Sequence, residues 1–194
     1  MIEIRNAIPE VLQDHVEQLI TAPTFPWFYI DDVSFPQVLP GEHYKQPGFN
    51  QTCLQDGNAA DEFAAFSFLM PIFRQHYIDN YQGEAVNLQP WRFRIGMNIP
   101  GEALHNNPHV DHTAELAPRI KTNVVALYYV NDDDGDTFIF NETAPSTCYT
   151  IKHRVKSERG KLLFFDGNHY HASSPAKTTK ARFVISLNLY EFAW

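Results

Sequence analysis

The sequence predicts a mainly β fold, a double-stranded β-helix of the jelly-roll type that α-helices near the N-terminus support. Two observations lead to this fold class. Up to about residue 82, apolar residues recur at three- and four-residue steps, which is the spacing of amphipathic helices. After Gly83 the chain changes to short strand-like runs separated by turn residues, which is typical of a sandwich or barrel. We therefore expect the helices to cover one face of a sheet.

The first part of the chain is expected to form two helices and one strand. The first helix runs from Pro9 to about Thr21, where the proline suits the first turn. Residues 25–30 follow as a strand. Residues 31–60 are rich in Pro, Gly, Asn and Gln and predict an extended surface loop. A second helix spans 61 to about 81, carries an aromatic stripe for the core, and is expected to kink or restart at Pro71.

The second part of the chain is expected to form the sheets. The predicted strands lie at 91–99, 109–112, 122–130, 136–140, 149–155, 161–166, 169–172 and 181–191. A chain of 194 residues is long enough to bury one sizeable core and too short for two comfortable domains. We expect a single domain over 1–194, with the helical support over about 1–82 and the jelly-roll core over about 83–194.

The composition argues against several classes of partner. A formal net charge of −8 disfavours a general nucleic-acid binder. The apolar runs fall far short of a membrane-spanning helix, so no membrane partner is expected. The N-terminal residues lack the pattern of a secretory signal. Cys53 and Cys148 are too few for a disulfide framework and favour free thiols in a reducing compartment. The expected location is cytoplasmic.

The triplet His109-Val110-Asp111 is the first candidate for a metal site. In a β-strand, residues i and i+2 point to the same face, so this imidazole and this carboxylate would share one cavity. A second histidine from a distant strand would complete two nitrogens and one carboxylate around an octahedral metal with open positions, which suits Fe(II). An apolar strand at 162–167 leads to His169 and His171, and either can supply that ligand.

Arg182 is the second candidate. The last predicted strand places it on the same face as Val184, Ser186 and Asn188, which points it into the interior. A buried guanidinium is costly unless it meets an anion. A bound carboxylate would satisfy it through two parallel hydrogen bonds, and the alternative is a salt bridge to an internal Asp or Glu.

These motifs, in this order, resemble the Fe(II)/2-oxoglutarate-dependent dioxygenases, especially their prolyl-4-hydroxylase-like branch. The resemblance covers about the last hundred residues and rests on His109-Val110-Asp111, Tyr128-Tyr129-Val130-Asn131, Gly135-Asp136-Thr137-Phe138, the strand at 162–167, His171 and Arg182. The chain departs from the family pattern at Ile99, where the family often has a tyrosine before Pro-Gly. It departs again at Asp136, which replaces the second glycine of a turn.

The resemblance implies a hydroxylase that uses Fe(II), the cosubstrate 2-oxoglutarate and dioxygen. His109, Asp111 and His171 would bind the iron. His171 is preferred over His169 because a small residue follows it and because its distance from the arginine is closer to the usual one. Arg182 would bind the far carboxylate of 2-oxoglutarate, and the Tyr129 hydroxyl would assist. Decarboxylation to succinate would be coupled to oxidation of a substrate C–H bond, by analogy that of a prolyl or other peptide side chain.

Two other functions remain possible interpretations of the sequence. A non-catalytic cupin-like binding module would explain the fold equally well, but it has no reason to keep three ligands and an inward cation. Another mononuclear metal enzyme, such as a zinc hydrolase, would also suit two histidines and a carboxylate, but it leaves Arg182 and Tyr129 unexplained. Residues 31–60 and 113–121 are the expected lids, and the primary substrate is either a peptide or a small molecule.

Overall fold

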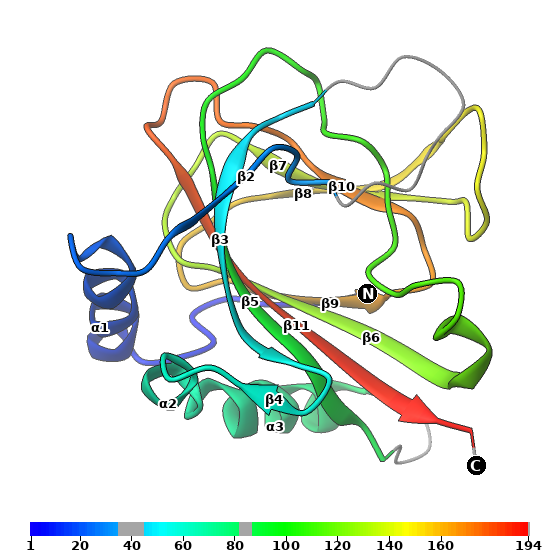
Figure 1. Cartoon of the computed structure of the whole chain (residues 1–194), viewed down its shortest axis with the longest axis horizontal. Helices are drawn as coiled ribbons and strands as arrows, with labels where there is room; N and C mark the ends of the chain where they lie inside the picture. The colour runs from blue at the N-terminus through cyan, green and yellow to red at the C-terminus, as the bar shows by residue number, and fades with distance from the viewer. Residues whose placement is uncertain (35–44, 82–86, 194) are drawn as a thin grey trace.

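The computed structural model describes residues 1–34, 45–81 and 87–193, and within them the strands form two antiparallel sheets (Figure 1). The strands are β1 (Ile2–Ile4), β2 (Phe28–Ile30), β3 (Gly48–Gln55), β4 (Asn58–Ala59), β5 (Gln89–Asn98), β6 (Ile120–Tyr129), β7 (Asp136–Phe140), β8 (Ile151–Lys156), β9 (Leu162–Asp166), β10 (His171–Ser173) and β11 (Arg182–Phe192). The large sheet has the order β1-β9-β6-β11-β5-β3-β2, with β4 paired to β3, and the small sheet has the order β10-β7-β8.

The helices lie on one side of the large sheet and the small sheet lies on the other (Figure 1). They are α1 (Glu10–Thr21), α2 (Phe63–Phe66) and α3 (Leu69–Asn80), and a short 3-10 turn follows later at Ala117–Arg119. Apolar side chains of the helices and the sheet, among them Val16, Phe73 and Phe93, form the main core and are fully buried. Each such side chain contributes about 1.5–3 kcal/mol through burial. In the described ranges, no helix has both the length and the apolar character needed to cross a membrane.

Strand β11, in the middle of the large sheet, shows how the sequence separates core from cavity. Phe183, Ile185 and Leu187 face the helices and join the main core. Arg182, Val184 and Ser186 alternate with them and line a cavity between the sheets. The predicted alternation of this strand is confirmed, and it places the candidate arginine between the two sheets.

Most of the predicted elements are confirmed within a few residues at their ends. The helix predicted over 9–21 is α1, and the strands predicted over 91–99, 122–130, 136–140, 149–155, 161–166, 169–172 and 181–191 are β5 to β11 in order. The second helix does restart, but α3 begins at Leu69 and holds Pro71 in its first turn, where the missing N–H is not needed. Strand β1 was not predicted.

The prediction of an extended loop over residues 31–60 is wrong for its second half. Residues 35–44 lie outside the described ranges, but β3 and β4 occupy 48–55 and 58–59, and β3 pairs along β5. Cys53 is fully buried on the helix side, whereas Asn50 and Thr52 are only partly buried on the other. A strand with a polar face toward a cavity lacks the apolar composition that marks buried strands.

The prediction of a strand over 109–112 is also wrong. His109 forms only an isolated antiparallel bridge, and its partner is His171. The next residues continue as irregular chain. The two candidate histidines are thus paired through their backbones, although no regular strand carries the first of them.

Candidate metal centre

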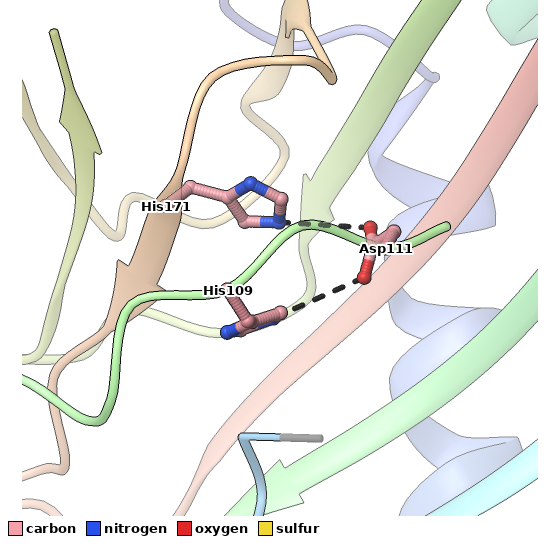
Figure 2. Close-up of side chains that lie close together, drawn as sticks. All are labelled: His109, Asp111 and His171. Atoms are coloured by element: carbon pink, nitrogen blue, oxygen red, sulfur yellow. Dashed lines mark ion pairs between the residues drawn. The ribbon is translucent and has the colours of Figure 1, made fainter. Parts of the chain in front are cut away.

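The three predicted ligand side chains meet between the sheets, where both imidazoles point toward Asp111 (Figure 2). The backbone bridge between His109 and His171 has N···O distances of 3.0 and 2.9 Å, and the ring centroids lie 4.8 Å apart. One potential ligand atom from each of the three residues lies within 4.8 Å of the other two. The backbone pairing brings together side chains that are 62 residues apart in the chain.

Hydrogen bonds to the backbone orient both imidazoles. His109 Nδ1 lies 3.1 Å from the carbonyl oxygen of Asn107, and His171 Nδ1 lies 3.0 Å from that of His169. A carbonyl oxygen only accepts, so each Nδ1 carries the proton and each Nε2 keeps a free lone pair. The Nε2 atoms lie 3.9 and 3.6 Å from the Asp111 carboxylate oxygens. Metal-binding histidines in proteins are held in this way, with one nitrogen donating outward and the other facing the metal.

The protonation states also suit a metal. Burial lowers the pKa of His109 to about 4, helped by the neighbouring His171 and opposed by Asp111, so the His109 imidazole is neutral at pH 7. Burial by itself would raise the pKa of the Asp111 carboxyl. The Arg92 guanidinium and the two histidines outweigh it and hold this pKa well below its usual range. A neutral imidazole and an ionised carboxylate are the forms that bind metal ions.

Two further residues hold the Asp111 carboxylate in place. Arg92 Nη2 forms an ion pair of 2.5 Å with Asp111 Oδ1, and Asn188 Nδ2 donates a hydrogen bond of 2.9 Å to Oδ2. Arg92 Nε in turn donates to Asn188 Oδ1 at 2.9 Å. The arginine and the asparagine are register partners on β5 and β11, so the large sheet itself fixes the carboxylate.

Arg182 is 2% exposed, and its hydrogen-bond partners in the described ranges are hydroxyl groups. Its Nε donates to Ser157 Oγ at 3.0 Å and its Nη2 to Thr137 Oγ1 at 2.8 Å. Among the residues that the structure describes, no carboxylate lies within ion-pair distance of this guanidinium, so the alternative of an internal salt bridge is wrong for them. Burial lowers the pKa of Arg182, and the nearby Tyr129, Asp133 and Asp136 only partly oppose this effect.

Tyr129 lies behind this arginine. Its hydroxyl donates to Thr137 Oγ1 at 2.8 Å, and the Arg182 guanidinium stands 5.6 Å from its ring centroid. Burial raises the pKa of the Tyr129 hydroxyl to about 12, so it stays a hydrogen-bond donor at neutral pH. Thr137 lines the cavity and Tyr129 does not. The tyrosine therefore reaches the cavity only through the threonine.

An open cavity connects the three candidate ligands to Arg182. Its lining comes from both sheets and consists of Val33, Arg94, Gly96, Asn98, His109, Asp111, Leu127, Thr137, His171, Ala172, Ser173, Arg182, Val184 and Ser186. Asp111 is the sole carboxylate in this set, and the two unpaired cations are Arg94 and Arg182.

Comparison with known proteins identifies the fold. No family model matches the sequence, and no curated protein matches it either. Solved structures match over nearly the whole chain. An oxidoreductase of the 2OG-Fe(II) oxygenase family from Burkholderia pseudomallei has a TM-score of 0.68 and 9% identity, with 97% of this chain and 83% of that one covered. The chain has the fold of the 2OG-Fe(II) oxygenases.

Other structures of this fold agree. A viral collagen prolyl hydroxylase of Paramecium bursaria Chlorella virus-1, solved as its 2OG complex, has a TM-score of 0.58 and 12% identity, covering 97% of this chain and 94% of that one. The epimerase SnoN, solved with Fe3+, alpha-ketoglutarate and nogalamycin RO, has a TM-score of 0.63 and 12% identity, covering 98% and 78%. The predicted double-stranded β-helix is confirmed.

In this oxygenase fold, the structure separates the two histidines between which the sequence left a choice. His171 faces Asp111, whereas His169 Nε2 lies 2.9 Å from Lys152 Nζ at the surface. His171 is the one that joins the group of three.

The two departures from the family pattern have visible surroundings. Ile99 is followed by Pro-Gly as noted, and the residue before it, Asn98, lines the cavity and donates to Ser173 Oγ at 3.0 Å. Asp136 is buried, but its carboxylate pairs with Arg154 Nε at 2.5 Å rather than with any cavity group. The Asp136 side chain is therefore not part of the cavity lining.

Sequence reasoning missed five residues that shape the site: Arg92, Arg94, Thr137, Ser157 and Asn188. A signal for two of them was present, because the strand at 91–99 alternates and so places Arg92 and Arg94 on one face. Only the pairing of β5 with β11 shows that Arg92 and Arg94 lie on the same face of the sheet as Arg182. The predicted lid at 113–121 borders a second hollow beside Asp111 and His112.

Proposed function

We propose that the protein is an Fe(II)- and 2-oxoglutarate-dependent dioxygenase that hydroxylates its substrate. The observation that carries the proposal is the pairing of two features in one cavity. His109, Asp111 and His171 offer two imidazole nitrogens and one carboxylate at one place, and Arg182 offers at another a buried cation that makes no ion pair with the described residues. The first set suits ferrous iron with open positions, and the second suits a carboxylate.

The bound iron would supply the activation of dioxygen, coupling decarboxylation of 2-oxoglutarate to succinate and carbon dioxide with insertion of one oxygen atom into a substrate C–H bond. The chain supplies the geometry. The backbone carbonyls behind His109 and His171 fix the tautomers, so both Nε2 lone pairs face the ion. Arg92 and Asn188 keep Asp111 ionised and oriented without occupying His109 or His171.

Arg182 would bind the far carboxylate of 2-oxoglutarate. A guanidinium has five N–H donors, and Ser157 and Thr137 each take one of them, which leaves donors for a bidentate carboxylate. The Thr137 hydroxyl oxygen accepts from both Arg182 and Tyr129, so its own proton is free to point to the same carboxylate. The predicted assistance of Tyr129 would act through this threonine.

The alternatives explain less of the site. A non-catalytic module has no need for an uncompensated buried cation, which costs free energy in the empty protein. A zinc hydrolase needs a general base beside the metal, and the described lining of the cavity holds no carboxylate other than Asp111. In addition, neither alternative gives Arg182 a role.

The substrate and the location belong to the proposal as well. Proteins of this fold include a collagen prolyl hydroxylase and an epimerase bound to nogalamycin RO, so the fold admits both peptide and small-molecule substrates. We propose one of these two classes, and no nucleic acid or membrane as partner. A reducing cytoplasm would suit Cys53 and Cys148, both of which are free thiols.

Turnover of the cosubstrate tests the proposal. The protein should convert 2-oxoglutarate to succinate in air with Fe(II) and ascorbate, and Zn(II) should not replace the iron. The variant His171→Ala should lose this reaction, because it removes one of three ligands. The matched control His169→Ala changes the same residue type two positions away and should keep it. Equal succinate formation by the two variants, or hydrolysis supported by zinc, would refute the assignment.

A further inference from the structure

Arg94 is the residue in the cavity that the proposed reaction leaves unused. It lies on β5 and lines the cavity with His109, Asp111 and Arg182. Its register partners are Thr52 on β3 and Ser186 on β11. Residues directly opposite in a sheet point to the same face, so Thr52 and Ser186 lie on either side of Arg94 on its face of the sheet.

The Arg94 guanidinium makes no hydrogen bond or ion pair with any residue in the described ranges. The other two arginines of the site differ: Arg92 is paired with Asp111, and Arg182 donates to two hydroxyls. Burial lowers the pKa of Arg94 to about 10, with Arg92 adding to this effect and Asp111 opposing it. This pKa lies above 7, so the side chain still carries its charge at neutral pH.

The sum of the charges at the site, counted with a ferrous ion and 2-oxoglutarate bound, favours a second anion in addition to 2-oxoglutarate. Arg92 already offsets Asp111. The two carboxylates of 2-oxoglutarate would offset Arg182 and one charge of a ferrous ion. The charge of Arg94 and one charge of the ion remain without a counterion, and an uncompensated cation at a partly buried site is costly.

We infer that the primary substrate carries a carboxylate and that Arg94 is the residue that binds it, beside the metal centre. The inference rests on the proposed function. A single guanidinium that lines the cavity matches the single charge and the two oxygens of a carboxylate. Arg94 lines the same cavity as His109 and Asp111, which places this anion site near the candidate ligands. The oxidised carbon then lies close to the substrate carboxylate.

Binding of matched acid and amide pairs tests the inference. The protein is loaded anaerobically with Fe(II) and 2-oxoglutarate and titrated by calorimetry with free amino acids, aliphatic and aromatic monocarboxylic acids, and tripeptides with a central Asp or Glu. Each compound is paired with the carboxamide that lacks the charge. The peptide arm and the free-acid arm separate the two sources of a carboxylate. The variants are Arg94→Gln, Arg94→Lys and the control Arg74→Gln, which removes an exposed charge on α3.

At least one acid should bind the unaltered protein about 10- to 100-fold more tightly than its amide, which is the effect of a hydrogen-bonded charge pair. Arg94→Gln should reduce the affinity for the acid to that for the amide. Arg94→Lys should restore part of the difference, and Arg74→Gln should leave it intact. The same acids should stimulate succinate formation in air.

Two results would overturn the inference while the proposed function stands. In one, no acid in either arm binds more tightly than its amide, although 2-oxoglutarate and iron bind. In the other, Arg94→Gln weakens the binding of 2-oxoglutarate about tenfold and leaves the preference for acids over amides unchanged. That result would assign Arg94 to binding of the cosubstrate. Failure of the proposed function can be distinguished from failure of this inference, because the visible band of the iron complex with 2-oxoglutarate would then be absent before any acid is added.

Discussion

At the residue scale, each charged group of the site is defined by what holds it. Asp111 is paired with Arg92 and hydrogen-bonded to Asn188, so its charge is compensated before any metal arrives. Arg182 and Arg94 form no ion pair with any residue that the structure describes, and they are the groups to which we assign carboxylates. A buried cation without a partner reduces stability, so a bound anion should be stabilising.

The Arg92–Asp111 pair gives a stability prediction. Arg92→Gln leaves a buried carboxylate without its cation, and we expect the metal-free protein to lose about 3 kcal/mol of unfolding free energy in a urea titration. Saturating Fe(II) should reduce the loss, because the ion takes over as counterion. The control Arg94→Gln removes a cation that has no partner and should cost far less. Equal losses in both variants would contradict this account of Asp111.

Arg182 and Tyr129 give a prediction on cosubstrate affinity. Arg182→Gln removes the buried cation, and the dissociation constant for 2-oxoglutarate should rise roughly 100-fold in anaerobic calorimetry. Tyr129→Phe removes a hydroxyl that touches Thr137 and not the cavity, so the constant should rise about fivefold or less. A larger effect from the tyrosine than from the arginine would reverse the roles that we assign.

The sequence was sufficient to find the candidate ligands that the structure brings together, and insufficient for the residues that support them. His109, Asp111, His171 and Arg182 could be predicted because a short motif and a regular strand alternation mark them. Arg92, Asn188 and Arg94 could not, because their roles depend on which strands become neighbours. That information lies in the pairing of β5 with β11, which joins segments about 90 residues apart.

At the element scale, regular strands carry most of the functional groups, among them His171 on β10 and Arg182 on β11, whereas His109 and Asp111 lie in irregular chain. His109 lies outside any strand and is held by the bridge to His171. Strand β3 was predicted as a loop because its cavity side is polar, and only its pairing with β5 makes it a strand. Propensity fails at such places because tertiary contacts decide the conformation.

The turn before β7 gives a prediction at this scale. A Cβ added at Gly135 would lie 2.8 Å from the Ser174 carbonyl oxygen and 3.1 Å from Arg182 Cδ. Gly135→Ala should therefore cost about 1–3 kcal/mol in thermal or urea unfolding and weaken 2-oxoglutarate binding by displacing Arg182. Gly96→Ala is the control for stability, since its Cβ would meet only the Val184 carbonyl oxygen at 3.8 Å. Full 2-oxoglutarate affinity in Gly135→Ala would show that Arg182 does not depend on this turn.

At the scale of the whole molecule, the large sheet separates two environments. Its helix side is an apolar core, and its other side faces the small sheet (Figure 1). The cavity between the sheets is lined by Arg94, Arg182 and Asp111, and Arg92 pairs with that carboxylate. The sequence predicted this general layout, a jelly roll supported by N-terminal helices, because the periodicity changes near Gly83. It did not predict that residues 48–59 join the large sheet.

The central claim is that His109, Asp111 and His171 bind one ferrous ion to which 2-oxoglutarate then adds, and anaerobic titration tests it most directly. Fe(II) followed by 2-oxoglutarate should produce a visible charge-transfer band that saturates at one equivalent of iron in the unaltered protein and in His169→Ala. His171→Ala should give no such band at the same concentrations. A band of full intensity in His171→Ala, or no band in the unaltered protein, would contradict the claim.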